Sequence, residues 1–451
     1  MSITPTQDSS SNFRQKIYRR EEHGISRKNI SQNALNVLYD LNAAGYQAYL
    51  VGGGVRDLLL GLKPKDFDVA TDASPEQVRQ VFRNSRIIGR RFQIVHVHYG
   101  REIIEVSTFR APSEQSTEIP GSSLSRRVKH LDSAHSQDGM ILRDNVFGSI
   151  EEDAIRRDFT VNALYYTVRN FEVLDFTGGM QDLQQGTMRI IGDPELRYRE
   201  DPVRTLRAIR LAAKLDFQIE EHSAKAIKPA AKLLLSVPAA RLFDEFLKLF
   251  FNGHGQSTFR QLLAFEVFAF LFPPVAEFIT TEQDQAMLHG AFASTDKRIA
   301  VGKSVTPAFL LAAILWPAVR RLFSQNLQTG MPPMPAMHDA GESVIKQQQE
   351  TLSIPKRFSI PMREIWEYQL RLERRSGKRA FALLSHKRFR AAYDFLLLRA
   401  DSGEDLQELA NWWTQFQDAD KDQRQAMQNK LGPADVSKSR KRRVKSRKGS
   451  K

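Results

Sequence analysis

Residues 50–72 read LVGGGVRDLLLGLKPKDFDVATD, and this stretch decides the fold of the first part of the chain. The apolar run that ends at Val51 predicts a buried strand, the glycines predict a turn, and VRDLLLG predicts a short helix. The run KDFDVAT predicts a second strand, in which Asp66 and Asp68 project from the same face. Two carboxylates so close repel each other unless a cation lies between them. The pair is therefore either solvated in a surface turn or part of a metal site.

The segments around this stretch predict a small mixed sheet. A helix is expected over residues 31–45 and another over 74–84, and the runs 86–99 and 101–109 are expected to form a hairpin. This β-α-β-α-β-β order indicates a mixed sheet with helices on one side. The polar, Ser-rich stretch 111–139 has no periodicity and predicts a mobile loop inserted in this domain.

The rest of the chain predicts an all-α part and a basic tail. From about residue 180 the pattern is almost wholly helical, and the last residues are a basic, low-complexity run. The expected fold class is therefore α/β followed by all-α. The expected divisions are a flexible basic arm (1–32), a mixed-sheet head (33–178), a helical neck (179–275), an Arg-rich helical domain (276–432) and a disordered basic tail (433–451).

Composition limits the classes of function. The chain has 451 residues, a formal net charge of +14 and a sequence pI of about 9.8. An excess of positive charge points to a polyanionic partner, with nucleic acid as the first candidate and an acidic membrane surface as the second. The chain contains no cysteine, which excludes disulfides, zinc–thiolate sites and thiol catalysis. Because the sequence shows no secretion signal and no bilayer-length apolar stretch, a cytoplasmic protein without a membrane span is expected.

The glycine turn favours a phosphate ligand. Gly52, Gly53 and Gly54 fit neither the G-x-G-x-x-G fingerprint nor the G-x-x-x-x-G-K-[ST] loop. Glycines at a strand-to-helix junction nevertheless let backbone N–H groups approach a phosphate, which Arg56 could also reach. Mg²⁺ suits the aspartate pair because it takes carboxylate oxygens and keeps open positions for substrate phosphates. His96 and His98 share one strand face but are expected as ordinary sheet residues rather than a zinc site.

Two more motifs follow in the chain. Residues 151–166 read EEDAIRRDFTVNALYY, and residues 199–210 read REDPVRTLRAIR. In the second motif Asp201 and Pro202 are a good N-cap and first helical residue. Its arginines recur every third residue and form one ridge of the helix. Together with LVGGGVRDLLLG and DFDVAT, these motifs resemble the class II nucleotidyltransferases, which include tRNA CCA-adding enzymes and bacterial poly(A) polymerases. RIIGRRFQIVHV (86–97), FGSIEEDA (147–154) and the Arg-rich last third are similar to the poly(A) polymerase branch.

The resemblance implies a nucleotidyltransferase head and assigns roles to its residues. Asp66 and Asp68 would bind Mg²⁺, or Mn²⁺, in a two-metal site that joins ATP to an RNA 3′ end with release of pyrophosphate. A third carboxylate is expected, and both Glu105 and Asp158 are candidates, with Asp158 slightly ahead as a member of the site. The remaining expected ATP-binding residues are Gly52, Gly53, Gly54, Arg56, Arg157, Asp201, Arg204, Arg207 and Arg210. Of these, the resemblance implies that Asp201 and Arg204 read the base, a task suited to a guanidinium beside a carboxylate. Arg207 and Arg210 would hold the base-reading residues in position or bind the triphosphate.

The implied activity is template-independent addition of AMP from ATP to RNA 3′ ends, a polyadenylation that promotes RNA decay in bacteria. The alternatives are a CCA-adding tRNA nucleotidyltransferase and an RNA-binding protein with an inactive head. RNA and ATP are the expected partners. The aromatic and basic helices of the last third are either an RNA track or a solvated face over a core of Phe381, Leu383 and Tyr393. Their candidate RNA-contacting residues are Trp366, Arg371, Arg374, Arg379, Arg388 and Arg390.

Overall fold

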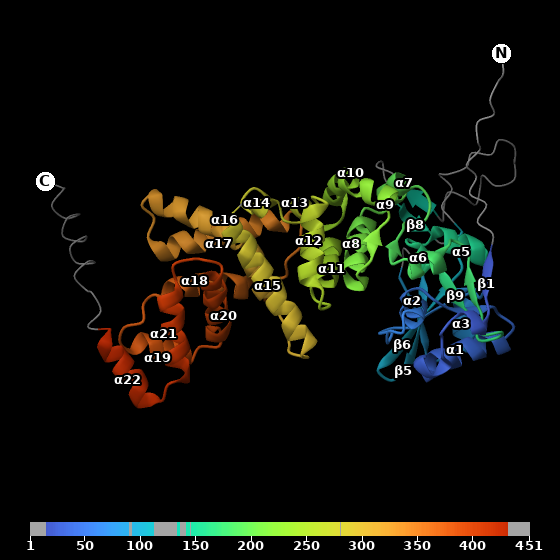
Figure 1. Cartoon of the computed structure of the whole chain (residues 1–451), viewed down its shortest axis with the longest axis horizontal. Coiled ribbons are helices and arrows are strands. Elements are labelled where there is room, and N and C mark those ends of the chain that lie inside the picture. The colour runs from blue at the N-terminus through green and yellow to red at the C-terminus, as the bar shows by residue number, and fades with distance from the viewer. Residues whose placement is uncertain are drawn as a thin grey trace, which may run out of the picture. The chain divides into compact units, whose positions relative to one another are not determined.

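A computed structural model describes residues 15–89, 93–111, 146–279 and 281–431, together with the backbone of two short strands, β7 (Ser133–His135) and β8 (Ile141–Asp144). The described chain forms two compact units that divide between Leu234 and Leu235 (Figure 1). Most of the expected insert 111–139 and the whole of the expected tail 433–451 lie outside the described residues.

The first unit is built on a mixed sheet, as predicted. Eight of the described strands form it, in the order β1-β10-β9-β2-β3-β6-β5-β4. Only the pair β3 and β6 is parallel among them; every other neighbouring pair is antiparallel. The strands are β1 (Lys16–Tyr18), β2 (Ala48–Val51), β3 (Asp68–Thr71), β4 (Ser85–Ile88), β5 (Ile94–Tyr99), β6 (Glu102–Thr108), β9 (Leu164–Tyr166) and β10 (Val173–Asp175).

Two helices pack on this sheet and on each other (Figure 1). They are α1 (Gln32–Ala43) and α3 (Pro75–Val81). In α1 the Ser31 hydroxyl caps the first turn by accepting from the Ala34 N–H at 3.1 Å. The apolar face of α1 is fully or almost fully buried, and it comprises Ala34, Leu35, Val37, Leu38 and Leu41. A shorter helix, α2 (Gly53–Leu59), begins directly after the central strand β2.

The N-terminal segment differs from the flexible arm expected over 1–32. In its described part, β1 pairs with β10, with Ile17 opposite Leu174. Further along, the His23 Nε2 donates to the Phe171 carbonyl oxygen at 2.9 Å, and the Arg27 guanidinium lies 4.7 Å from the Phe171 ring centroid. The polar composition of this segment suggested a loose chain, but an edge strand is held by backbone hydrogen bonds that composition does not reveal.

The first unit continues beyond the sheet with short elements that lead to the helix bearing REDPVRTLRAIR. They are α5 (Ile150–Arg156), the 3₁₀ helix η3 (Thr160–Asn162), α6 (Gly179–Gln184), β11 (Thr187–Met188), α7 (Pro194–Glu200), α8 (Val203–Leu215), β12 (Gln218–Ile219), α9 (Glu221–Lys225) and α10 (Ile227–Ala231). The expected neck over 179–275 is thus divided, because its part up to Leu234 belongs to the same compact unit as the sheet.

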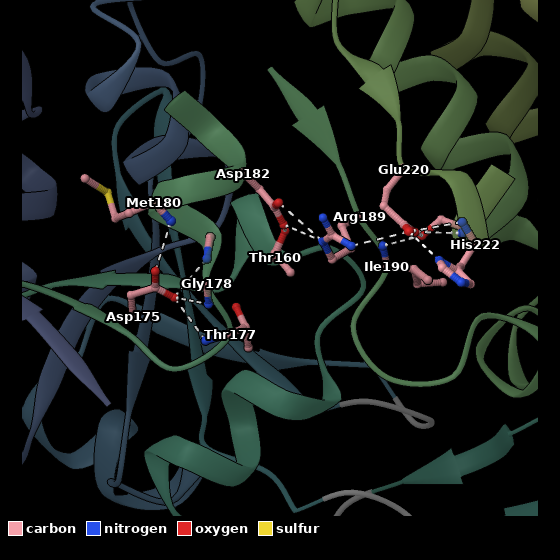
Figure 2. A network of polar contacts seen from close by, with 12 residues as sticks. Thr160, Asp175, Thr177, Gly178, Met180, Asp182, Arg189, Ile190, Glu220 and His222 are labelled. Carbon is pink, nitrogen blue, oxygen red and sulfur yellow. Dashed lines mark hydrogen bonds and ion pairs between the residues drawn. The ribbon is translucent and has the colours of Figure 1, made fainter. Parts of the chain in front are cut away.

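A polar network joins the end of the sheet to these elements (Figure 2). The Asp175 carboxylate accepts four backbone N–H groups at the start of α6, from residues 177 to 180, at 2.9–3.0 Å. In α6, Asp182 accepts from the Thr160 hydroxyl at 2.7 Å and forms an ion pair with Arg189 at 3.1 Å. Arg189 also lies 3.4 Å from Glu220, which caps α9. Through Thr160, the segment 158–160 is therefore connected to α6 and α9 by hydrogen bonds and ion pairs.

The second unit is helical throughout its described secondary structure, as predicted. Its helices are α11 (Ala239–Phe250), α12 (Gly255–Ala264), α13 (Phe268–Leu271), α14 (Pro273–Ala276), α15 (Glu282–Ala300), α16 (Pro307–Gln328), α17 (Pro333–Gln349), α18 (Lys356–Leu372), α19 (Lys378–Leu384), α20 (Phe389–Asp401), α21 (Gln407–Asp418) and α22 (Lys421–Lys430). By length and composition α16 could cross a membrane, but every residue from Leu310 to Val319 is buried, and α16 packs against α17 and α18. Its apolar run is the core of the unit.

Candidate active site

The two aspartates of the DFD motif lie at the start of β3, in the middle of the sheet. Asp68 is the first residue of β3 and is half-buried, whereas Asp66 precedes the strand and is exposed. Phe67, between them, is buried. Alternation along an extended chain is expected to place the two carboxylates on the side opposite to the Phe67 ring.

Glu105 stands beside Asp68 on the neighbouring strand. In the parallel pairing of β3 with β6, Asp68 is the direct partner of Glu105, and in the next pairing Glu105 is opposite His96. The His96 Nε2 lies 3.5 Å from the Glu105 Oε1, and the Glu105 side chain is 52% exposed. Partners in register share a face of the sheet, so the Glu105 and Asp68 carboxylates rise from the same face.

The electrostatics of this group favour a cation. Burial, together with the nearby charges of Glu105 and Asp66, raises the pKa of Asp68 to about 6, although the Arg157 charge acts in the opposite direction. Three carboxylates close together repel one another unless solvent or a positive ion reduces the repulsion. Within the described ranges no group of three or more His, Asp or Glu side chains is placed so that it could hold a metal ion. An open set of carboxylates nevertheless fits Mg²⁺, which takes one or two carboxylates and completes its shell with water and substrate phosphates.

The glycine turn lies directly over the aspartates. Gly52 has φ +70°, and a Cβ at this position would be 3.7 Å from the Asp68 Oδ2 and 3.8 Å from the Arg157 Nη1. A Cβ on Gly54 would meet the Asp66 carbonyl oxygen at 3.4 Å. Because neither residue has a side chain, the backbone between β2 and α2 comes close to both aspartates. Part of the space that a phosphate would need is left open by Gly52.

Arg56 is placed differently from the phosphate-reaching role expected of it. Its side chain is only 5% exposed, and it donates to the Asp57 carboxylate at 2.6 and 2.8 Å and to the Asn162 Oδ1 at 2.7 Å. Asp57 in turn lies 3.4 Å from Lys214 of α8. The guanidinium thus connects α2 to the 3₁₀ turn after the RRD motif. The sequence could not reveal this, because Asn162 is 106 positions away in the chain.

Arg157 is held near Asp68 by hydrogen bonds to two buried residues, Asp153 and Tyr165. Its guanidinium donates to the Asp153 carboxylate at 2.9 Å and to the Tyr165 hydroxyl at 2.8 Å, and the same hydroxyl donates to Asp153 at 2.7 Å. Burial acts to lower the pKa of Arg157, but Tyr165 and Asp153 outweigh it and raise the pKa. The guanidinium therefore stays charged beside Asp68 and can bind an anion there.

Asp158 faces away from this group and toward α8. Its Oδ2 accepts from the Arg207 guanidinium at 2.5 and 2.8 Å, and its Oδ1 accepts from the Phe159 N–H at 2.9 Å. Burial acts to raise the pKa of Asp158, but the charge and hydrogen bonds of Arg207, the hydrogen bond from Asn162 and the Arg204 charge together outweigh it and lower the pKa to about 2. Of the two candidates for the third carboxylate, only Glu105 lies beside Asp68.

The helix α8 carries the arginine ridge that the sequence predicts. Asp201, Arg204, Arg207 and Arg210 are each partly exposed, whereas Val203, Leu206 and Ile209 are buried. The helix begins at Val203 with Pro202 as its N-cap, one residue later than expected. The Asp201 carboxylate still accepts from the Val203 N–H at 3.3 Å, so it satisfies one N–H of the first turn.

A buried arginine that the sequence reading missed connects this helix to the RRD motif. The Arg197 Nη2 donates to the carbonyl oxygens of Arg156 and Arg157 at 2.5 and 2.6 Å. Its Nη1 donates to Glu200 at 2.8 Å, and the same Glu200 oxygen accepts from the Arg204 Nη1 at 2.9 Å. The spacing of Glu200 and Arg204 by four residues was a usable signal for this pair. Nothing in the sequence indicated the contact between Arg197 and the RRD backbone.

In the second unit the structure separates core residues from surface arginines. Trp366 is fully buried and its Nε1 donates to the Ala312 carbonyl at 3.1 Å, so it is a core residue rather than part of an RNA surface. Arg388 forms an ion pair with Glu364, and Arg390 forms one with Asp394 at 2.9 Å. As the alternative reading expects, the core beneath these helices includes Tyr393, with Phe381 and Leu383 packed against it.

Three family profiles match the chain in the order of its parts. The family described as "Poly A polymerase head domain" matches residues 48–189, and "Probable RNA and SrmB- binding site of polymerase A" matches residues 216–279. "Polymerase A arginine-rich C-terminus" matches residues 329–448. The head profile covers the glycine turn, the aspartate pair and the RRD motif.

Whole-chain comparisons give the same relationship. The poly(A) polymerase I of Salmonella typhi is 51% identical over 421 residues, which cover 92% of this chain and 88% of that protein. The CCA-adding enzyme of Lactobacillus helveticus is 37% identical over 230 residues, 51% of this chain and 52% of that protein. Among solved structures, the Thermotoga maritima CCA-adding enzyme complexed with tRNA shares the fold, with 20% identity, a TM-score of 0.58 and coverage of 87% of this chain and 84% of that one. Because the likeness to poly(A) polymerase I extends over nearly the whole of both chains, this protein belongs to the poly(A) polymerase I family of nucleotidyltransferases.

Proposed function

We propose that the chain adds AMP from ATP to RNA 3′ ends without a template and releases pyrophosphate. The observation that carries this proposal is the extent of the likeness: it spans 92% of the chain for a poly(A) polymerase I but 51% for a CCA-adding enzyme. By analogy with the bacterial relatives, we place the reaction in the cytoplasm, where polyadenylation would promote RNA decay.

The substrate preference can be tested directly. The purified chain, Mg²⁺ and an unstructured RNA are incubated with each nucleoside triphosphate separately. We expect long products with ATP alone and little extension with CTP, GTP or UTP. A product that stops after the addition of C, C and A to a tRNA would replace this proposal with the CCA-adding alternative.

We infer that Asp66, Asp68 and Glu105 hold the divalent ions, Mg²⁺ or Mn²⁺. Such ions, when bound, activate the attacking 3′ hydroxyl and neutralise the charge of the leaving pyrophosphate. Glu105 is preferred over Asp158 because it is the partner of Asp68 in the sheet, whereas Asp158 is neutralised by Arg207. The Asp68→Ala variant should lose AMP incorporation while RNA retention on a filter stays nearly unchanged. Undiminished incorporation in this variant would show that the pair is not the metal site.

The chain's own groups would orient the triphosphate. The positions of Gly52 and Arg157 next to Asp68 support a role for the glycine turn and the Arg157 guanidinium in binding phosphate oxygens. Gly53 belongs to the same turn. Arg56 supports the turn from within, since its guanidinium would lie 3.3 Å from a Cβ on Gly53. These residues would exclude water from one side of the triphosphate and hold it for in-line attack.

Asp201 and Arg204 are proposed to read the base of ATP. Only the Nη1 of Arg204 is engaged with other described residues, so its other guanidinium N–H groups can donate to a base edge. A carboxylate acceptor on Asp201 and a guanidinium donor on Arg204, one helical turn apart, can form a hydrogen-bond pattern that fits one base better than the others. Arg207 and Arg210 would then hold these base-reading residues in position, and Arg207 would do so through its ion pair with Asp158.

The surface arginines of α18 and α19 remain the proposed RNA-binding surface. Arg374 and Arg379 are its main candidates, because Arg371, Arg388 and Arg390 are paired with carboxylates and Trp366 is buried. Truncation after Pro433 tests the basic tail, which is expected to add phosphate contacts: RNA affinity should fall and its salt dependence should become less steep. An unchanged salt slope would remove the tail from the RNA-binding surface.

A further inference from the structure

A second cavity lies far along the chain from the nucleotidyltransferase residues. Its volume is about 600 Å³, and it is formed within the second unit by α15, the start of α16 and α20. All of its lining residues fall between Ala286 and Ser402, and none is a residue of the candidate active site. Ligand sites for small molecules and single nucleotides have volumes of roughly 300–1,000 Å³. The cavity is large enough for one nucleotide.

The floor of the cavity is apolar and includes an aromatic ring. Phe309, Leu397 and Leu398 line it and are only partly buried. The Phe309 ring is held in place by a T-shaped contact with the buried Phe395, at 6.0 Å between ring centroids. A Cβ on Gly290 would lie 2.9 Å from the Leu398 Cδ1, so the absence of a side chain there lets α15 and α20 come close together. A partly exposed ring on an aliphatic floor can take a flat, apolar group such as a nucleobase.

The rim of the cavity carries cations. Arg298 of α15 and Lys387, just before α20, are exposed members of the lining. Across the described part of the chain neither side chain is paired with a carboxylate. A third cation, Arg390, is paired with Asp394 at 2.9 Å. Free positive charges beside an apolar floor suit a ligand that has both a ring and a phosphate.

Two carboxylates complete the lining. Asp394 and Asp401 are both on α20, and both belong to the cavity wall. A carboxylate is a hydrogen-bond acceptor only, so it favours a base that presents an exocyclic amino group. Uracil has no such group, whereas adenine, cytosine and guanine do, and adenine is the base that the proposed function adds to the strand.

We propose that this cavity binds one adenine nucleotide of the RNA strand at a position away from the reacting 3′ end. The base would lie on the Phe309 floor, with its amino group toward the carboxylates of α20 and its phosphates at Arg298 and Lys387. This proposal rests on the proposed function, because a strand extended by AMP presents adenylates to the protein that extends it. Such a site would favour strands that already carry an adenylate tail.

Photocrosslinking of the full chain tests the site without any substitution. An oligoadenylate that carries 8-azidoadenine is irradiated with the protein, and the labelled peptides are mapped by mass spectrometry. We expect labelling within residues 286–309 or 387–402, competed by unlabelled oligoadenylate and not by oligouridylate. If free ATP competes as well as oligoadenylate at these peptides, the cavity binds an adenine nucleotide, but the ligand is free ATP and not the RNA strand. Absence of label from both segments overturns the proposal.

A cavity-filling variant gives an independent readout. Ala391 lines the cavity, and Ala391→Trp should weaken oligoadenylate binding about tenfold, the loss expected for one stacked base, and leave oligouridylate binding unchanged. The matched control is Ala426→Trp, which places the same side chain at an exposed position of α22, outside the cavity and outside the proposed RNA-binding surface. Equal weakening for both strands, or none for either, contradicts the proposal. A wild-type chain that labels at the cavity but adds no AMP would refute the proposed function alone.

Discussion

Glu105 is the direct partner of Asp68 in the parallel pairing of β6 with β3, in the middle of the mixed sheet. Asp158, the other carboxylate that the motifs suggest, has its Oδ2 2.5 Å from the Arg207 guanidinium. The two acidic residues therefore have different surroundings, and substitution should separate their roles.

Glu105→Gln keeps the size of the side chain and removes its charge. We expect AMP incorporation to fall by about a hundredfold or more, since loss of one carboxylate from a two-metal site removes several kcal/mol of stabilisation. The thermal midpoint should hardly change, because the Glu105 side chain is 52% exposed. Incorporation is measured at saturating ATP and RNA. The matched control is Glu102→Gln on the same strand, and equal loss in both variants would contradict a special role for Glu105.

Asp158 should influence stability in acid. Its pKa in the folded chain is about 2, below its ordinary value of 3.8, so it stabilises the fold at pH values above about 4. This contribution should be lost as the pH falls from about 4 to about 2. Asp158→Asn should be less stable than the wild type at pH 6, by about 2 kcal/mol, and the difference should shrink at low pH. Denaturant unfolding at a series of pH values measures it, and a constant difference would contradict the pairing with Arg207.

Gly52→Ala tests the close approach of the turn to the aspartates. The added Cβ would lie 3.7 Å from the Asp68 Oδ2 and would occupy a backbone conformation of φ +70°. We expect a loss of about 1–2 kcal/mol of stability from the backbone and a further, larger loss of activity. Gly61→Ala is a matched control: it has the same φ of +70° and nothing within 4 Å of its Cβ. Equal activity in the two variants would show that the space over Asp68 is not used by ATP.

Arg204→Lys tests the reading of the base. Lysine keeps the charge but loses the planar set of donors, so we expect the preference for ATP over CTP to fall by about tenfold or more. The ratio of kcat/KM for the two nucleotides is the measurement. Arg199→Lys, at an exposed position of the neighbouring helix α7, is the control. An unchanged ratio in Arg204→Lys would assign base selection to other residues.

The sequence was sufficient for the framework of the head. The glycine turn, the DFD strand and the apolar face of α1 are local patterns, and local patterns determine which elements form and which side of each is buried. The ridge on α8 was predictable for the same reason. The sheet register that makes Glu105 the partner of Asp68 was not, because it depends on pairing between strands 37 positions apart in the chain.

The partners of the arginines were the least predictable part of the site. Arg56 and Arg157 both follow motifs that suggest phosphate binding, yet Arg56 is committed to Asp57 and Asn162. Trp366 similarly suggested an RNA surface from its basic neighbours but is fully buried. A guanidinium or an indole can be either a contact residue or an internal support, and only tertiary packing decides which.

The buried Arg197 has a consequence for engineering nucleotide preference. It binds the backbone of the RRD motif and shares Glu200 with Arg204, and burial together with the nearby Arg204 charge lowers its pKa to about 10. Arg197 therefore connects Arg204, the proposed base-reading residue, to Arg157, the proposed phosphate-binding residue. We expect a redesign that changes Arg204 to accept another base to move Arg157 relative to the proposed metal site as well. Specificity and rate should therefore change together, and residues 156–204 should be redesigned as a single piece.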